Sequence, residues 1–306
     1  MEAWLKRPWG YMHNHSSKEG LWAHSYHIYV RQPYEWDPMT MTLHAKSTGT
    51  IALPALQAHR ARLNSVGRAR NAQISLDEWG SGPPWKAPSM GTPHAIFAAA
   101  LLLQLIKGAK SLRLASANLY APVNEGAIAV GRWSASLTPL GEALQLVSQH
   151  QGRFLLPVPP QWGSSEPSEV EAVVTASSLM SSRRRSNGGL PSFLATLANC
   201  NAAATHTRRL QLPLGRDPLR ATLEATELRA SGIDPVASGK LGDIGNFTRV
   251  RPRPLVACQD RHGRVSGEWA SEWDAGVQCA AGARLGVQLE LAPFSVVHVS
   301  VSLVPV

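Results

Sequence analysis

The sequence predicts two kinds of structure in succession: a parallel α/β sheet covered by helices, and then an antiparallel β-sandwich. Between residues 24 and 152, a strand-like segment is followed by a segment with helical spacing three times in a row. Residues 157–169 (PVPPQWGSSEPSE) are rich in Pro, Gly and Ser, and the helical pattern fades after them. Residues 294–306 alternate between apolar and polar side chains, as a strand does. We therefore expect an α/β domain over 1–156 and a β-sandwich domain over 157–306.

Each strand and helix of the first part has its own signal. Two of the helices are expected to begin at a Thr-Pro pair, Thr92-Pro93 and Thr138-Pro139, and to stop at Gly108 and Gly152. The expected strands, each rich in β-branched or apolar residues, are 24–30 (HSYHIYV), 71–79 (NAQISLDEW) and 111–119 (SLRLASANL). The expected helices are 50–67 (TIALPALQAHRARLNSVG), 94–107 (HAIFAAALLLQLIK) and 140–151 (LGEALQLVSQHQ).

The second part contains short segments typical of strands. They are 192–200 (SFLATLANC), 208–214 (RRLQLPL), 219–228 (LRATLEATEL) and 294–306 (FSVVHVSVSLVPV). The last gives the clearest pattern, because Val297, Val299, Val301 and Leu303 fall on one face. His298, Ser300 and Ser302 fall on the other face.

Composition excludes several function classes. The net charge is +9, but the densest basic run, Arg183 to Arg185, lies among Ser, Asn and Gly without aromatic neighbours, so we expect an exposed loop and no nucleic-acid partner. The longest apolar run, 95–106, is too short to span a bilayer, so no membrane partner is expected. Residues 1–10 lack the apolar core of a signal peptide, and the compartment stays open. The cysteines, Cys200, Cys258 and Cys279, are unpatterned and predict neither a zinc site nor a disulfide framework.

No cofactor or metal site is expected. His13, His15, His24 and His27 are close in sequence, but the first two lie in a polar segment, MHNHSS, that is expected to be irregular. The chain also contains neither a Gly-rich phosphate loop nor a Ser-His-Asp signature.

The chemistry-bearing stretch is 73–82, QISLDEWGSG. An apolar strand ends there on an acidic pair, Asp77 and Glu78, followed by Trp79 and a glycine. The carboxyl ends of parallel strands form the rim at which α/β proteins bind ligands. We therefore expect both carboxylates at a candidate site.

The chain resembles the C-terminal half of α-L-arabinofuranosidases of glycoside hydrolase family 51. The resemblance is carried by these residues, by SYHIYV upstream and by LELAPFSVVHVSV at the end of the chain. The resemblance implies the last strands of a (β/α)₈ barrel of clan A, followed by a β-sandwich. It also implies a retaining mechanism on terminal arabinofuranosyl residues of polysaccharides, with Glu78 as the nucleophile. His27 and Tyr29 match the family's His-x-Tyr, and Asp77, Trp79 and Asn118 are expected to contact the sugar.

The chain departs from the family pattern at the second carboxylate. In the family, the acid/base is a glutamate that follows an asparagine on an earlier strand. The Asn124-Glu125 pair follows the nucleophile strand, so its order is wrong for that role, although Asn124 is a further candidate for sugar contact. We expect that this chain lacks the first half of the barrel. Unpaired sheet edges and an apolar inner face would then favour homo-oligomers or aggregation.

Three readings remain open at this stage. The chain is an arabinofuranosidase-type hydrolase of arabinose-containing polysaccharides, another clan A glycosidase of the β-xylosidase or endoglucanase type, or a non-catalytic sugar-binding remnant. Trp79 and Trp85 flank the acidic pair and would stack on a sugar in the first two cases, but tryptophans in such loops also serve as packing.

Overall fold

The structure is a computed structural model of the 306-residue chain. It describes residues 23–31, 33, 37–82, 91–120, 126–157, 169–177, 192–214, 219–231, 246–260, 264–265, 277–280 and 282–305. The expected loop at Arg183 to Arg185, His13, His15, Trp85 and the Asn124-Glu125 pair lie outside these residues.

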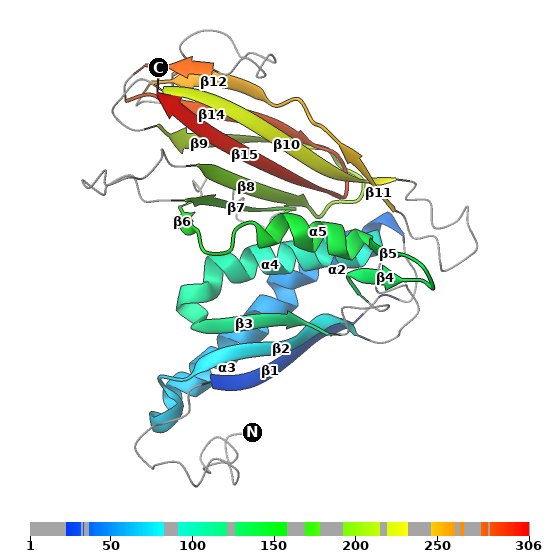
Figure 1. The fold of residues 1–306 in the computed structure, drawn as a ribbon. Coiled ribbons are helices and arrows are strands. Elements are labelled where there is room, and N and C mark those ends of the chain that lie inside the picture. Colours follow the sequence, from blue (N-terminus) through cyan, green and yellow to red (C-terminus); the bar gives the residue numbers. More distant parts are fainter. Residues whose placement is uncertain are drawn as a thin grey trace.

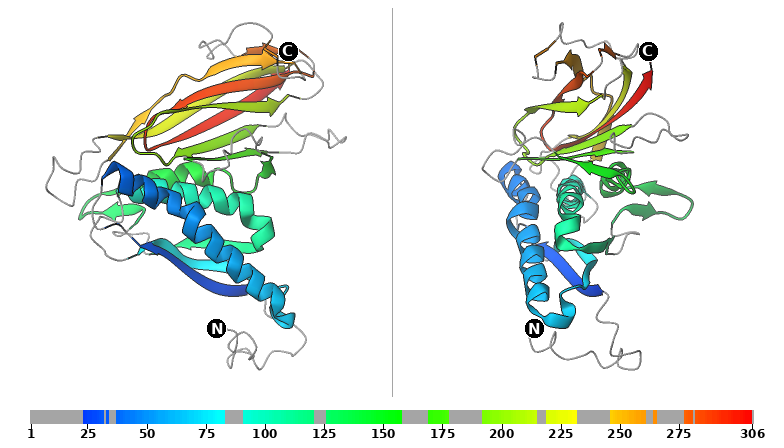
Figure 2. Two further views of the ribbon diagram at one scale, coloured as in Figure 1. Left: turned by 180° about the vertical axis from the view of Figure 1, so that it is seen from behind. Right: turned by 90° about the vertical axis from the view of Figure 1, so that its left-hand side faces the viewer.

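The described elements form layers (Figure 1). A small sheet, β1-β2-β3, is covered on one face by the helices, and the opposite side of the helix layer contacts a seven-stranded sheet, β11-β10-β15-β8-β7-β6 with β13 beside β10. A three-stranded sheet, β12-β14-β9, lies on the far side of the large sheet. Figure 2 shows the same order from two other sides, with the hairpin β4-β5 projecting from the helix layer.

The small sheet confirms the expected parallel strands. It contains β1 (Ala23–Arg31), β2 (Gln73–Gly82) and β3 (Leu114–Leu119), and β2 pairs in parallel with both neighbours. The face toward the helices is apolar: Ile74 and Leu76 are fully buried in the helix-side core. Helical crossovers connect these strands, which is the arrangement that parallel pairing requires.

The crossover between β1 and β2 contains more helix than the sequence indicated. The expected helix at 50–67 is α3 (Leu53–Ser65), but a π-helix (Thr48–Ala52) and α2 (Pro38–Ser47) precede it without a break. Asp37 caps α2 through a reciprocal capping box with Thr40. A 3₁₀ turn, Gly67–Ala69, then leads into β2.

Helix α4 (Thr92–Leu112) is longer than predicted at both ends. Its N-cap is Gly91 instead of Thr92, and it passes through Gly108 to end at Leu112. The C-cap, Arg113, takes the left-handed conformation with φ of 52°. Gly108 was therefore wrongly interpreted as a stop. By length and composition α4 could span a membrane, but most of it is buried in the molecule, as in a core helix.

Helix α5 (Pro139–Ser148) begins as expected, with the Thr138 hydroxyl accepting a hydrogen bond from the Gly141 amide at 3.2 Å. A hairpin of β4 (Ile128–Val130) and β5 (Ala135–Leu137), absent from the prediction, precedes it. Gly152 follows α5 with φ of 72°, a conformation that favours glycine.

The remaining strands pair antiparallel in two sheets. The four strands that the sequence predicted are present as β8 (Phe193–Asn199), β9 (His206–Pro213), β10 (Leu219–Ser231) and β15 (Ser295–Pro305). The other strands are β6 (Phe154–Leu156), β7 (Val170–Ala176), β11 (Asn246–Val250), β12 (Leu255–Gln259), β13 (Val277–Cys279) and β14 (Arg284–Leu291).

Both faces of the large sheet are used. The predicted alternation of β15 holds: Val297, Val299, Val301 and Leu303 join a core shared with β9, β12 and β14. The opposite face contacts α4, and Val296 belongs to the helix-side core. The large sheet therefore packs against the helix layer on one face and against the small antiparallel sheet on the other.

The cysteine prediction was wrong. Cys258 on β12 and Cys279 on β13 form a disulfide with a Cα–Cα distance of 5.5 Å, and Cys200 is free and buried. β12 belongs to the small antiparallel sheet and β13 pairs with β10 of the large sheet. The disulfide therefore links the two sheets, which no spacing rule could show.

Removing this disulfide should lower the free energy of unfolding by about 3 kcal/mol, because its sequence separation of 21 residues closes a loop of moderate length. The test is the denaturation midpoint of a Cys258→Ala/Cys279→Ala variant compared with the parent under oxidising conditions. Cys200→Ala is the matched control that leaves the linkage intact. If the parent kept its midpoint in reductant, the linkage would contribute nothing.

Candidate active site

The site begins with an irregularity in β2. Tyr26 pairs with Leu76 and His27 pairs with Glu78, so Asp77 is an extra residue relative to β1. The pairing of β2 with β3 also shifts between Leu76 and Trp79. This β-bulge places Asp77 and Glu78 in succession at partly exposed positions, while the residues on either side are buried. A regular strand would have turned one of the two carboxylates into the core.

The face of the small sheet opposite the helices is polar. Its side chains are Ser25, His27 and Tyr29 of β1, Ser75, Asp77 and Glu78 of β2, and Ser116 and Asn118 of β3. The expectation of an uncovered apolar inner face was therefore wrong. The strands alternate between core-facing apolar residues and these polar ones, so the open face is compatible with water or a polar ligand.

Glu78 is held through one carboxylate oxygen. The Tyr29 hydroxyl donates to Oε2 at 2.9 Å, and His27 Nδ1 lies 3.3 Å from the same oxygen. No described residue makes a hydrogen bond to Oε1, and the side chain is about one-third exposed. The carboxylate is thus oriented by two neighbours while the side chain stays partly exposed.

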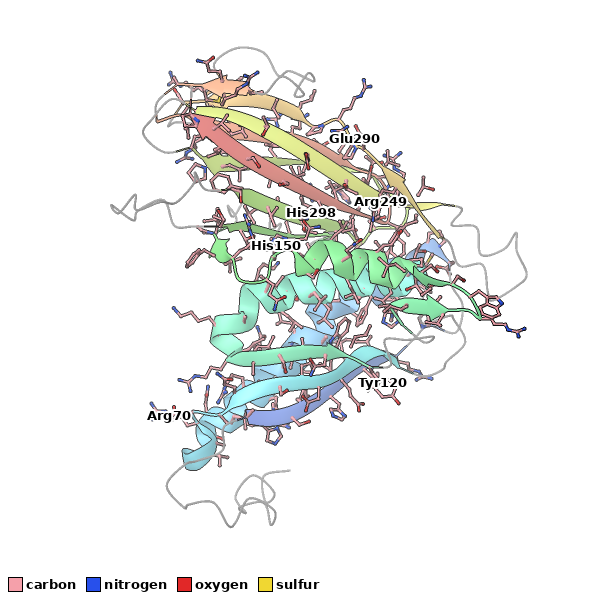
Figure 3. The ribbon with its side chains drawn as sticks, viewed as in Figure 1. Arg70, Tyr120, His150, Arg249, Glu290 and His298 are labelled. Atoms are coloured by element: carbon pink, nitrogen blue, oxygen red, sulfur yellow. A yellow bond between two sulfur atoms is a disulfide. The ribbon has the colours of Figure 1, made fainter. Side chains whose placement is uncertain are left out.

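Tyr29 is suited to be a permanent donor. Partial burial, together with its hydrogen bond to the nearby Glu78 carboxylate, raises the pKa of Tyr29 to about 12. The phenol therefore remains protonated near neutral pH and keeps its proton available for the hydrogen bond to Glu78. Tyr120, beyond the end of β3, meets the Tyr29 ring edge-on at 6.4 Å and is exposed (Figure 3).

Asp77 has a different environment from Glu78. Hydrogen bonds from the Ser25 and Ser75 hydroxyls hold the pKa of Asp77 below its ordinary value, against a smaller opposing effect of burial. Ser75 also bonds Ser116 on β3 at 2.7 Å. These hydroxyls connect all three strands below the acidic pair and keep Asp77 ionised.

The other expected site residues divide between the open face and the core. Asn118 is exposed on β3, beside the bulge. Trp79 is 1% exposed and packs in the helix-side core, so direct stacking on a sugar is excluded and the sequence interpretation of Trp79 is corrected. Ser25, Ser75, Ser116 and Tyr120 were missed. Only the alternation of HSY and QIS could have indicated the first two.

Metal coordination has no basis in the described part of the chain, where no group of three or more His, Cys, Asp or Glu side chains could hold an ion. His24 contacts His59 at 3.2 Å beside the sheet, and His27 contacts Glu78.

Comparison with known proteins identifies the fold. No protein-family model matches the sequence, and no curated protein matches it. An arabinofuranosidase structure aligns with 91% of this chain at 15% identity and a TM-score of 0.55. The family 51 arabinofuranosidase of Xanthomonas axonopodis pv. citri aligns with 98% at 18% identity and a TM-score of 0.56. The α-L-arabinofuranosidase of Thermotoga maritima aligns with 90% at 17% identity and a TM-score of 0.54.

The chain spans about half the length of these structures, 52%, 56% and 52% respectively. At such low identity the likeness concerns the fold and leaves the reaction and substrate undecided. The small parallel sheet, the helices and the paired antiparallel sheets together are similar in fold to about half of each of these arabinofuranosidase structures.

Proposed function

We propose that this chain is a retaining glycosidase of the α-L-arabinofuranosidase type, with Glu78 as the nucleophile. In this proposal residues 1–156 are the C-terminal part of a (β/α)₈ barrel and residues 157–306 are a β-sandwich domain. The substrate is a terminal arabinofuranosyl residue of a polysaccharide or oligosaccharide. The observation that carries the proposal is the partly exposed Glu78 carboxylate, held at Oε2 by Tyr29 and His27.

The chemistry requires this kind of carboxylate. In the first step an oxygen of Glu78 bonds to the anomeric carbon, the bond from that carbon to the leaving oxygen breaks, and the leaving group takes the electron pair. A nucleophile must be ionised, oriented and partly exposed. The Tyr29 hydrogen bond supports orientation of the carboxylate, and the bulge at Asp77 supplies exposure.

Asp77 and Asn118 are proposed to bind sugar hydroxyls. Both are on the open face near Glu78, and an ionised Asp77 is an acceptor with capacity left beyond its serine partners. His27 is proposed to help position Glu78 and the sugar. These roles belong to the same proposal as the nucleophile.

Incubation with an aryl α-L-arabinofuranoside that has an activated phenolate leaving group should label the protein once. We expect one added pentosyl unit on the peptide that contains Glu78, detected by mass spectrometry of a digest, and no labelling of Glu78→Ala. Tyr29→Phe should slow labelling by about tenfold, because a hydrogen bond to a charged group contributes about 1.5–3 kcal/mol.

The matched control is Glu290→Ala, which removes a carboxylate from the exposed side of β14, on the other side of the molecule (Figure 3). It should label like the parent. Labelling of a peptide other than the one containing Glu78, or equal labelling of Glu78→Ala, would contradict the nucleophile assignment.

A second candidate is a non-catalytic sugar-binding protein. The described residues of the open face contain only Asp77 and Glu78 as carboxylates, and the lowered pKa of Asp77 makes it a poor proton donor. If the parent bound arabinose or arabino-oligosaccharides but took no label from the activated substrate, this candidate would replace the first. A clan A glycosidase of the β-xylosidase or endoglucanase type would instead take label from the corresponding aryl xyloside or glucoside.

Self-association is also proposed. In the described part of the chain β1 and β3 each pair only with β2, so neither outer edge of the parallel sheet has a neighbouring strand among the described residues. The open face is polar, so burial of apolar surface would not favour association there. A homo-oligomer would instead form by pairing of strand edges between two copies of the chain.

A further inference from the structure

A cavity lies on the helix side of the parallel sheet, away from Glu78. Its volume is about 480 Å³, within the roughly 300–1,000 Å³ of small-molecule sites. The lining comes from α2, the π-helix, α3 and α4 on one side and from β7 and the residue that follows β8 on the other. The cavity thus occupies the junction between the helix layer and the large sheet.

The π-helix shapes one wall of this cavity. Such turns are rare and occur frequently at functional sites. Thr48 and Gly49 belong to it, and a Cβ at Gly49 would stand 3.0 Å from Gln104 Nε2. The glycine therefore permits the close approach that holds the Gln104 amide at the cavity wall.

The floor of the cavity carries a buried polar group that lacks a partner. Gln104 Nε2 donates to Glu171 Oε1 at 2.8 Å, and Lys107 Nζ donates to Glu171 Oε2 at 2.6 Å. These bonds fix the amide orientation so that Gln104 Oε1 is the free end. Gln104 is 6% exposed, and its Oε1 has no hydrogen-bond partner among the described residues. A buried acceptor without a partner is costly, so a ligand that donates to it would be stabilised.

The charges at the cavity are paired. Lys107 neutralises Glu171, and Lys46 lies 3.7 Å from Glu169. The ammonium groups retain donor hydrogens beyond these pairs. Leu53 and Leu112 add apolar surface to the lining. The groups suit a neutral molecule with several hydroxyls and an apolar C–H face better than an anion.

We propose that this cavity is a second binding site, for a neutral sugar of one or two rings, separate from the Glu78 face. A ring hydroxyl would donate to Gln104 Oε1, other hydroxyl oxygens would accept from Lys46 and Lys107, and C–H groups would pack on Leu53. The ligand class follows from these groups alone and holds whether or not Glu78 is a nucleophile.

The test uses a reporter thiol at the cavity mouth. Ser111 lines the cavity and is exposed, and Ser111→Cys in a Cys200→Ala background leaves one thiol outside the disulfide. Its alkylation rate by iodoacetamide is measured by mass spectrometry with arabinose, xylose, arabinobiose, xylobiose or inorganic phosphate. At a sugar concentration ten times its Kd, alkylation should slow by about tenfold.

Three further variants locate the effect. Gln104→Leu should abolish protection by sugar, and so should Gln57→Trp, which fills the mouth from an exposed position without touching the Glu171 pair. Thermal melts check that both fold. Gln145→Leu, at an exposed glutamine of α5, is the matched control and should keep full protection. Glu78→Ala should also keep it.

Protection by phosphate but by none of the sugars would overturn the proposal, since the cavity would then take anions. Absence of protection by every probe, or protection that disappears in Glu78→Ala, would overturn it as well. Because the reporter is at the cavity, failure of the Glu78 labelling experiment leaves this result unaffected.

Discussion

Acidification from neutral pH to about pH 4 should unfold the protein. His150, which follows α5, and His298 on β15 are buried between the helix layer and the large sheet (Figure 3). His150 bonds Thr175 and Thr196 at 2.8 Å each, and His298 bonds Thr196 at 2.7 Å. Burial lowers the pKa of both histidines to about 4, with a smaller contribution from the nearby Arg153. Protonation of either imidazole in the folded state therefore costs free energy, because the charged ring would be buried.

Two histidines near the parallel sheet add to this effect. Burial lowers the pKa of His44 to about 4 and that of His94 to about 3. Because the folded pKa values lie below the ordinary 6.5, the unfolded chain binds more protons between about pH 6.5 and pH 4. Stability from these groups is complete above pH 6.5 and is lost progressively as the pH falls through this window.

The size of the effect decides the outcome. A shift of about two pKa units corresponds to about 3 kcal/mol for one histidine, and total stabilities are typically about 5–15 kcal/mol. Two or three such groups would therefore be enough to unfold the chain before pH 4. The measurement is the denaturant midpoint followed by circular dichroism at several pH values.

A variant isolates the contribution of one histidine. His298→Leu should weaken the dependence of stability on pH by up to one proton within the window, even if stability at neutral pH falls through loss of the Thr196 bond. His27→Gln is the matched control, because its side chain is about half exposed and hydrated in both states. Constant stability between pH 7 and pH 4.5 would show that these histidines are not buried as described.

Much of the fold was predictable because local patterns and long-range packing agree. Ile74 and Leu76 lie in the core where strand alternation placed them, and Thr138 caps α5 as its side chain favours. Gly108 failed as a stop signal because α4 continues past it to Leu112, which is buried in the core, and this packing overrides the preference of one glycine. The Cys258–Cys279 pairing depends on the approach of two sheets, which sequence spacing does not encode.

The residue types showed which stretch of the sequence carries the candidate site, but they did not show which side chains meet there. Tyr29 and Glu78 are 49 positions apart, and only parallel pairing of β1 and β2 brings them together. The bulge at Asp77 moves each later side chain of β2 to the opposite face of the sheet. Trp79, which was expected beside a sugar, therefore lies in the core. A bulge has no sequence signal here, because neither Asp77 nor its neighbours are glycines.

If the open face has no second carboxylate, the rate of glycosyl transfer to Glu78 should depend steeply on the leaving group. Activated aryl arabinofuranosides should label the protein, whereas natural arabinan should be hydrolysed negligibly. A sugar alkoxide is a poor leaving group unless an acid protonates it as the bond breaks. The measurement compares labelling rates over a series of phenols of rising pKa with arabinose release from arabinan.

The described residues around Glu78 offer no group for that proton transfer. Asp77 has a lowered pKa and stays ionised, and Tyr29 has its pKa raised to about 12 and its proton directed at Glu78. The two ring nitrogens of His27 face Glu78 Oε2 at 3.3 Å and Ser25 Oγ at 3.5 Å. The same lack of a general base should slow hydrolysis of the glycosyl ester, so the label should persist.

Added azide provides the decisive comparison. Azide is already anionic and needs no base, so it should attack the anomeric carbon, release Glu78 as a carboxylate and yield an arabinosyl azide of retained configuration. Its rate should exceed that of water, and Glu78→Ala should form no retained product. Fast release of arabinose from arabinan without azide would show that a proton donor is present at the site, and if that release survived Glu78→Ala, a different nucleophile would be required.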